Sequence, residues 1–162
     1  MSEPSTAPYR PAGPLQLSGW FADDGTHRFP LRVYYEDTDA GGIVYHANYL
    51  RFVERARSEM LRLLGLTHGG LAGASGVSFA VRRLTIDFVA PARLEDTLEV
   101  ETRITDTGGA SFAVAQTVRR DGRDLARADL QLVMINQAGR PARLPAPVRE
   151  AIDALYKKQM RD

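Results

Sequence analysis

The hydrophobic pattern of this chain changes its period at the small residues Ala40-Gly41-Gly42. Before them, apolar and polar side chains alternate from Phe29 to Asp37, which is typical of a half-buried strand. After them, the segment from about Tyr45 to Leu64 has helical spacing with one apolar stripe. Gly65 is well placed to end that helix as a left-handed cap. The sequence therefore predicts a strand, a sharp turn and one long amphipathic helix.

Beyond an expected glycine-rich loop at residues 69–76, the period of two returns. Apolar residues from Val77 to Val81 share one phase, whereas those from Leu84 to Phe88 share the opposite phase. The slip falls at Arg82-Arg83, and a one-residue slip inside a long strand predicts a β-bulge.

Three more strands and a short final helix complete the predicted order. The strands cover Leu98–Ile104, Ser111–Arg119 and Leu125–Ile135, with hairpin turns at Gly108-Gly109 and Asp121-Gly122 and a helix from Pro147. One long helix with hairpin-linked strands predicts an α+β fold, in which an antiparallel sheet packs on the helix. We expect one domain over residues 28–162, preceded by a largely flexible N-terminal extension over residues 1–27.

Composition excludes several classes of function. The 162 residues include 21 basic and 20 acidic side chains, a balance that gives no electrostatic case for a nucleic-acid partner. There is no cysteine, which excludes disulfides, thiolate metal sites and a cysteine nucleophile. We find no secretory signal pattern and no apolar run of about 18 residues that could span a membrane. The chain is therefore expected to be cytoplasmic.

The turn between strand and helix carries the candidate chemistry. Asp37 and Asp39 stand where the strand ends, and His46 is expected in the first helical turn, where amide groups lack partners within the helix. Such amides can bind an oxyanion while a carboxylate acts on the same carbonyl group, so the pattern favours acyl transfer. Either Asp has a plain alternative as a helix cap or Asx-turn residue. A calcium-binding loop that starts at Asp37 is excluded, because its twelfth position is Asn48 and not the bidentate glutamate that such loops use. The three histidines lack the spacing of a zinc site.

A resemblance to a known family rests on this same segment. The run VYYEDTDAGGIVYHANYLRFVERARSEMLRLLG, residues 33–65, resembles the signature of the 4-hydroxybenzoyl-CoA thioesterase superfamily. It is most similar to the YbgC-like acyl-CoA thioesterases encoded with the Tol–Pal envelope system. The similarity continues through FAVRRLTIDFVAPARLEDTLEVETRI and weakens after about Asn136. The resemblance implies the hotdog fold, in which a five-stranded antiparallel sheet wraps one long central helix.

The resemblance also implies roles for residues of the turn. Asp39 matches the catalytic carboxylate, which either attacks the thioester or activates water. His46 matches the histidine whose backbone amide is the expected oxyanion donor. Gly42, Ile43 and Tyr45 are expected to shape the turn and contact the substrate. No cofactor and no metal are implied, since coenzyme A is part of the substrate.

Three further residues have two interpretations each. Glu54 matches a position that faces the acyl pocket in relatives, or it forms an (i, i+3) surface pair with Arg57. Arg82 and Arg83 either meet the phosphates of coenzyme A or form a solvated strand edge. The resemblance further implies a homo-oligomer, a tetramer or at least a dimer, with the active site at the subunit interface.

The leading hypothesis is therefore an acyl-CoA thioesterase of unspecified acyl-chain length. A hotdog dehydratase acting on acyl thioesters is less favoured, because the His/Asp or His/Glu placement of those relatives is not found. A third hypothesis, from another class, is a binding module for acyl carrier protein or lipid-synthesis enzymes associated with the Tol–Pal system. Asp39 and His46 are both present, which argues against a binding module whose active site has lost its activity.

Overall fold

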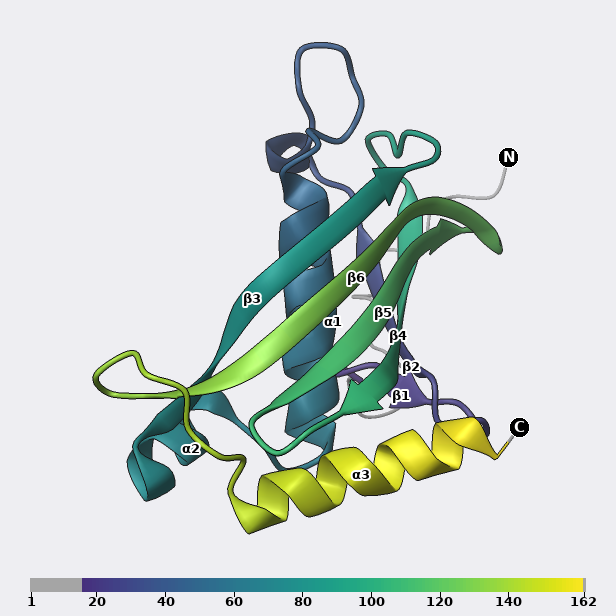
Figure 1. Cartoon of the computed structure of the whole chain (residues 1–162). Helices are drawn as coiled ribbons and strands as arrows, with labels where there is room; N and C mark the ends of the chain where they lie inside the picture. Colours follow the sequence, from purple (N-terminus) through teal and green to yellow (C-terminus); the bar gives the residue numbers. More distant parts are fainter. Residues whose placement is uncertain (1–15, 162) are drawn as a thin grey trace, which may run out of the picture.

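The computed structural model describes residues 16–161 as a curved sheet with three α-helices (Figure 1). The strands are β1 (Trp20–Phe21), β2 (His27–Arg32), β3 (Val77–Phe88), β4 (Thr97–Thr107), β5 (Ser111–Arg120) and β6 (Arg123–Asn136). The helices are α1 (Asn48–Leu63), α2 (His68–Ser75) and α3 (Ala146–Met160), with a short 3₁₀ helix η1 at Tyr35–Asp37. The five expected strands are present, and β1 adds a sixth.

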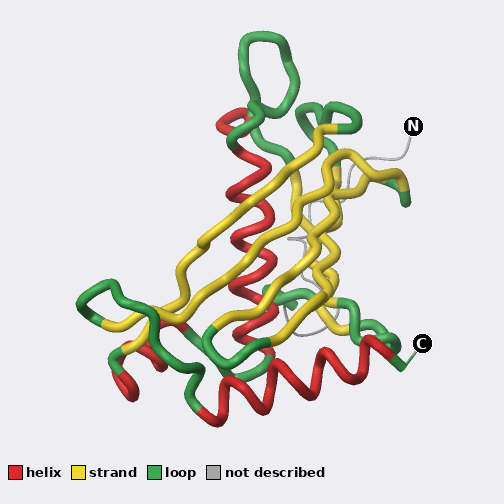
Figure 2. The backbone as a smooth tube through the Cα atoms, in the orientation of Figure 1, coloured by secondary structure: helices red, strands yellow, loops and turns green. Residues whose placement is uncertain are grey.

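All neighbouring strands run antiparallel, in the order β1-β2-β4-β5-β6-β3. Figure 2 shows the strands in yellow and the helices in red, in the orientation of Figure 1. Both predicted hairpin turns form; at the second, Asp121 and Gly122 have φ values of 51° and 75°, which suit a primed turn. The predicted bulge in β3 is also present, as a register shift between Val81 and Arg83. β1 and β3 are therefore the two edge strands of the sheet. α1 lies between β2 and β3 in the sequence, so it connects β2, next to one edge, with β3 at the opposite edge.

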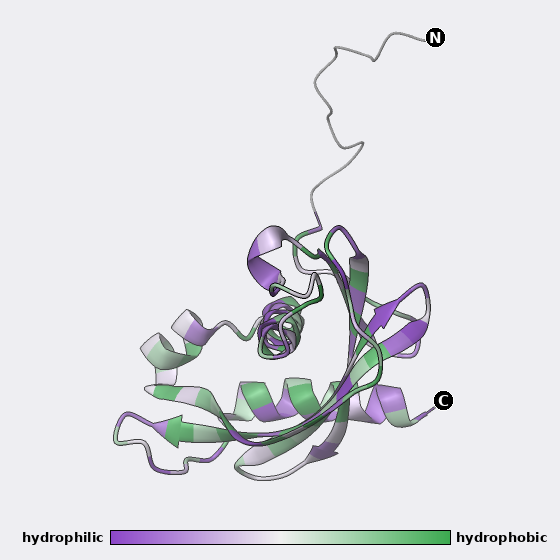
Figure 3. Ribbon diagram, turned by 90° about the horizontal axis from the view of Figure 1, so that it is seen from above, coloured by the Kyte–Doolittle hydropathy of each residue, from purple (hydrophilic) through white to green (hydrophobic). Residues whose placement is uncertain are grey.

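The concave face of the sheet holds the core, with α1 lying in its hollow (Figure 3). Side chains of β4, β5 and β6 alternate in burial, because successive residues of a strand point to opposite faces. The predicted stripe of α1 is buried at Tyr49, Val53, Ala56 and Met60. α3 covers the end of the hollow near the C-terminus of α1, where Val148 and Ile152 join the same core as Met60.

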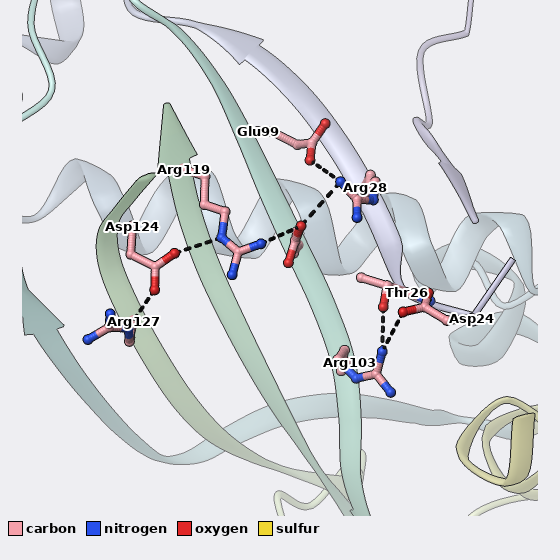
Figure 4. Close-up of polar contacts among 9 residues, drawn as sticks. Asp24, Thr26, Arg28, Glu99, Arg103, Arg119, Asp124 and Arg127 are labelled. Atoms are coloured by element: carbon pink, nitrogen blue, oxygen red, sulfur yellow. Dashed lines mark hydrogen bonds and ion pairs between the residues drawn. The ribbon is translucent and has the colours of Figure 1, made fainter. Parts of the chain in front are cut away.

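The convex face carries a chain of ion pairs across four strands (Figure 4). Glu101 on β4 contacts both Arg28 on β2 and Arg119 on β5, at 3.2 and 2.7 Å. Asp124 on β6 contacts Arg119 and Arg127, each at 2.7 Å. This face is consequently polar, as expected for the side of the sheet that has no helix on it.

The sequence expectations are wrong for the end of β2 and for the glycine-rich segment. The strand expected to reach Asp37 ends at Arg32, because Asp37 closes a local turn with Tyr34 and forms η1 instead. The glycine-rich segment expected to be a loop forms α2. Thr67 caps this helix by accepting a hydrogen bond from the amide of Gly70, and its glycine content hides the helical pattern.

The expected N-terminal extension is only partly described. Residues 1–15 lie outside the described residues. Residues 16–27 include β1 and the first residue of β2, so the boundary expected after residue 27 falls inside β2. His27 is fully buried, and its Nε2 lies 2.8 Å from the carbonyl oxygen of Ser18. This contact connects residues 16–21 to the sheet.

Candidate active site at the strand-to-helix turn

The end of β2 leads into a turn that is built around Asp37. The Asp37 side chain is buried, and its Oδ2 accepts a hydrogen bond from the amide of Tyr34 at 2.8 Å. Its carbonyl oxygen accepts two further hydrogen bonds, from the amide of Tyr45 and from the side chain of Asn48, both at 2.9 Å. These contacts are those of a structural residue that ties the turn to the start of α1.

Asp39, by contrast, presents an exposed carboxylate. Its Oδ1 accepts a hydrogen bond from the amide of Gly41 at 2.8 Å. Its amide donates to the carbonyl oxygen of Ile43 at 2.9 Å, and its carbonyl oxygen accepts from the amide of Gly42 at 3.0 Å. Gly42 has a φ of +76°, a left-handed conformation that favours glycine. The backbone is thereby folded tightly, while the carboxylate remains accessible to a ligand.

His46 lies two residues before α1, so the expectation that it belongs to the first helical turn is wrong. The amides of Asn48 and Tyr49 donate back to the carbonyl oxygens of Tyr45 and His46, at 2.8 and 3.3 Å. Within residues 16–161, the amides of His46 and Ala47 have no acceptor. These two amides lie at the positive end of the α1 dipole, where they can donate to a developing oxyanion.

A cleft of about 310 Å³, named here the turn cleft, opens beside His46. It is lined by Ile43, Val44, His46, Tyr49, Phe88, Val89, Ala90 and Pro91. The buried Tyr49 hydroxyl accepts a hydrogen bond from the amide of Ala92 at 3.0 Å, and burial raises the pKa of Tyr49. The phenol therefore stays protonated at neutral pH. The turn cleft is an apolar site that has an imidazole and a phenol among its walls.

Five of the eight expected site residues lie on the turn, and two of these line the cleft. Ile43 and His46 line it directly, and the ring of Tyr45 lies 4.5 Å from that of His46, centroid to centroid. Asp39 and Gly42 are joined to this group through the short turn, because Asp39 is hydrogen-bonded to Ile43. The turn thus combines an exposed carboxylate, unpaired amides and an adjoining apolar cleft, which is a suitable arrangement for acting on a bound acyl group.

Glu54 and the arginine pair lie elsewhere in the chain. Glu54 is exposed on α1, and the surface pair with Arg57 does not form, because Arg57 is buried. Arg82 and Arg83 are exposed at the β3 bulge. Arg83 precedes Phe88 by five residues, or about 17 Å of strand, so in one chain the pair does not reach the turn cleft.

The sequence did not predict a buried polar cluster that lies between α1 and the sheet. Arg57 Nη1 donates to Gln116 Oε1 at 3.0 Å. Gln116 Nε2 in turn donates to the carbonyl oxygen of Val53 at 2.8 Å and to Thr102 Oγ1 at 2.9 Å. One signal could have identified this cluster: Gln116 and Thr102 occupy the inward phase of otherwise apolar strands.

Within residues 16–161, no group of three or more histidine or carboxylate side chains is arranged to hold a metal ion. No helix in this part of the chain combines the length and the apolar character that crossing a membrane requires.

Comparison with known proteins places these features in a family. The model of the thioesterase-like superfamily matches residues 33–152. The acyl-CoA thioesterase YbgC of Haemophilus influenzae is 41% identical over 133 residues, which cover 82% of this chain and 98% of that protein. The acyl-CoA thioester hydrolase YbgC of Escherichia coli is 53% identical over 91 residues, which cover 56% of this chain and 67% of that protein.

A solved structure supports the same assignment. The crystal structure of a probable thioesterase from Bartonella henselae is 42% identical, covers 74% of this chain and 99% of its own, and superposes with a TM-score of 0.71. The curved antiparallel sheet around α1 is the hotdog fold that the sequence resemblance implied, with one strand more than expected. This chain belongs to the thioesterase-like superfamily, and within it to the proteins similar to YbgC.

Proposed function

We propose that this protein is an acyl-CoA thioesterase that hydrolyses the thioester to a free acid and coenzyme A. The observation that carries the proposal is the turn itself: the exposed Asp39 carboxylate and the unpaired amides of His46 and Ala47 lie on one short segment, whose Ile43 and His46 line an apolar cleft. Thioesterases are also what the relatives at 41% and 53% identity are named. No cofactor is required in this proposal.

In the proposed reaction, the thioester carbonyl oxygen points toward the amides of His46 and Ala47. Negative charge that develops on this oxygen is stabilised by the amides and by the helix dipole. Asp39 either attacks the carbonyl carbon to give a mixed anhydride, which water then hydrolyses, or takes a proton from the water that attacks this carbon. In both routes the C–S bond breaks, and the thiolate of coenzyme A leaves and is protonated. Gly42, Ile43 and Tyr45 hold the turn in shape. Arg82 and Arg83 are candidate contacts for the phosphates of coenzyme A.

The test compares wild type with Asp39→Asn on a panel of acyl-CoAs, by following the release of free thiol. We expect kcat to fall by about 100-fold or more, the usual contribution of a general base. Glu36→Gln is the matched control, because Glu36 is an exposed carboxylate in the same turn. His46→Ala should lower kcat less than Asp39→Asn, since the amide of residue 46 remains. Near-wild-type turnover by Asp39→Asn overturns the assignment.

The same acyl-CoA panel also distinguishes a thioesterase from the two alternative functions. If no acyl-CoA is hydrolysed, while the protein forms a stable complex with acyl-loaded carrier protein, a binding module of the Tol–Pal system is favoured. With enoyl-CoA, a dehydratase changes the acyl chain without releasing thiol, and a thioesterase releases thiol.

The lack of cysteine suits a reducing compartment, so the cytoplasm is the proposed location.

We also propose a homodimer, formed through the edge of β3, as the minimal active unit. β3 pairs with β6 on one side only, so its other edge presents unpaired amide and carbonyl groups. Large apolar side chains are exposed near this edge, including Val81, Phe88 and Val89. Val81→Lys, which places a charge among the exposed apolar side chains of this edge, is expected to give monomers in sedimentation experiments and to lower activity. Further association into a tetramer would be visible in the same experiment.

A further inference from the structure

The turn that carries Asp39 belongs to a small antiparallel ribbon, named here the turn ribbon, which consists of residues 38–39, 43–44 and 92–93. Thr38 pairs with Val44, and Ile43 pairs with Arg93, both in the antiparallel sense. The amide of Asp39 donates to the carbonyl oxygen of Ile43 at 2.9 Å, which closes the first pair of segments. The turn ribbon therefore joins the segment before β4 to the strand-to-helix turn.

The turn ribbon has a buried face and an exposed face. Val44 and Ala92, on adjacent segments, are only 3% and 0% exposed. Successive residues of an extended segment point to opposite faces, so Ile43 and Arg93 point away from the core. Asp39 and Arg93 are exposed, and Ile43 between them is partly exposed. Asp39, Ile43 and Arg93 consequently form one row on the exposed face.

This row brings Arg93 within reach of a substrate that is bound at Asp39. Side chains directly opposite each other in antiparallel segments have Cβ atoms about 5 Å apart, so the Cβ atoms of Asp39 and Arg93 lie about 10 Å apart. An arginine side chain extends roughly 6 Å beyond its Cβ. Ile43, which lies between the two residues, also lines the turn cleft. The arrangement is complete within one chain.

The guanidinium of Arg93 is not engaged by a neighbouring carboxylate. Asp96 accepts a hydrogen bond from the backbone amide of Arg93 at 2.8 Å, and its ion pair is with Arg120, at 2.5 Å. Within residues 16–161, no carboxylate lies within ion-pair distance of the Arg93 guanidinium. The donors of this side chain are therefore available to a ligand.

We propose that Arg93 binds the pantetheine arm of the substrate, by donating hydrogen bonds to the amide oxygen nearest the sulfur. This oxygen is roughly five bonds, or about 6 Å, from the sulfur of a thioester placed at Asp39, which is well within the reach of Arg93 across Ile43. The phosphates at the far end of the arm are roughly 16 Å from the sulfur, at the limit of that reach. The inference rests on the proposed thioesterase function.

The test places one acyl group, the one that the wild-type protein hydrolyses fastest, on three thiols. Coenzyme A carries the amide and the phosphates, N-acetylcysteamine carries the amide alone, and ethanethiol carries neither. We expect Arg93→Met to lower kcat/KM by roughly 10-fold on the first two thioesters, the lower end of the range for hydrogen bonds to charged groups. Activity on the ethyl thioester should keep its wild-type value.

Two further variants sharpen this comparison. Arg93→Lys keeps the charge with fewer donors, so it should lose less activity than Arg93→Met on the two amide-containing thioesters. Arg123→Met changes an exposed arginine at the first residue of β6, and it should keep the wild-type values on all three thioesters.

The loss should appear in KM and not in kcat. The amide of the pantetheine arm is the same in the bound substrate and in the transition state, so a contact with it contributes uniform binding. A disturbed catalytic turn would instead lower kcat on every thioester. The hydrogen bonds that residue 93 makes within residues 16–161 come from its backbone, so the substitutions should leave the fold intact, as urea unfolding can verify.

The outcomes that overturn the inference differ from those that overturn the function. Equal losses on all three thioesters overturn it, because the ethyl thioester has no amide to bind. A loss on the coenzyme A thioester alone also overturns it, in favour of a phosphate contact. Unchanged values on all three would make Arg93 a solvated surface side chain. Failure of the wild-type protein to release thiol from any acyl-CoA instead rejects the thioesterase function.

Discussion

The side-chain amide of Asn48 donates a 2.9 Å hydrogen bond to the backbone carbonyl oxygen of Asp37, and both residues are buried. Asn48 is the first residue of α1, and Asp37 is the last residue of η1. This contact, together with the hydrogen bond from the Tyr45 amide to the same oxygen, therefore ties the start of the helix to the turn that carries Asp39. The position of the free amides relative to the carboxylate depends on it.

Asn48→Ala should lower both stability and turnover. The substitution removes a buried hydrogen bond, and we expect a loss of about 1–3 kcal/mol in the free energy of unfolding. Activity on acyl-CoA should fall as well, because the turn is less firmly attached to the helix. Urea unfolding and thiol release measure the two effects. Gln137→Ala, at an exposed position, is the control and should change neither. An Asn48→Ala protein with wild-type stability contradicts this role.

The two aspartates of the turn should respond in opposite ways. Asp37→Ala removes the acceptor of the Tyr34 amide in a buried position, so a destabilisation of about 1–3 kcal/mol is expected. Asp39→Asn changes an exposed side chain and should alter the free energy of unfolding by less than about 0.5 kcal/mol while lowering kcat by about 100-fold or more. Urea unfolding and thiol release, measured on both variants, distinguish a structural role of Asp37 from a catalytic role of Asp39. Equal stability of the two variants would show that the distinction is wrong.

Gly42→Ala should disturb the turn through its backbone alone. An added Cβ meets no atom within 4 Å, but the φ of +76° costs a non-glycine residue about 1–2 kcal/mol. We expect lower stability by that amount and reduced kcat/KM. Gly69→Ala is the matched control, because Gly69 also has open space but lies in α2 without a positive φ. That control should be neutral or stabilising by up to about 1 kcal/mol. Similar effects of the two substitutions would contradict the argument.

Sequence reasoning recovered most of the fold, because the main signals are local. The alternation of β4 to β6, the stripe of α1 and the bulge at Arg82-Arg83 all follow from side-chain period. It failed at η1, where one carboxylate hydrogen bond overrides the alternating pattern, and at α2, where glycines mask the helix. Periodicity marks Gln116 and Thr102 as polar residues in an inward phase, but it does not show that they meet Arg57, because Arg57 and Gln116 are 59 residues apart in the sequence. Such contacts exist only once the sheet has wrapped around the helix.

The ion pairs of the convex face should stabilise the fold weakly. The hydrogen bond from Arg119, with that from Arg127, lowers the pKa of Asp124, so this carboxylate is charged throughout the neutral range. Asp124→Asn should destabilise the protein by about 0.2–1 kcal/mol at low salt, the usual range for exposed pairs. The difference should shrink in 1 M salt, because the charges are screened over about 3 Å. Asp129→Asn, an exposed position of β6 without an ion-pair partner in the described residues, should show no such salt dependence.

His27 should make the stability depend on pH below neutrality. Burial lowers the pKa of His27, while the hydrogen bond to Ser18 and the charge of Glu59 act in the opposite direction, and Nδ1 has no partner in residues 16–161. The unfolded chain therefore takes up a proton near pH 6.5, before the folded protein does. Stability should be complete above about pH 6.5 and should fall as the pH is lowered from there toward the folded-state pKa.

Urea unfolding at several pH values from 7.5 to 5 measures this dependence. His27→Gln keeps a side-chain donor toward Ser18 but cannot take up the proton, so its stability should change less over this interval. His68→Gln removes an exposed histidine and should retain the wild-type slope. The carboxylates with lowered pKa values, Asp24, Asp96 and Asp124, titrate below this interval and do not account for the slope. Parallel curves for wild type and His27→Gln would exclude His27 as the source of the pH dependence.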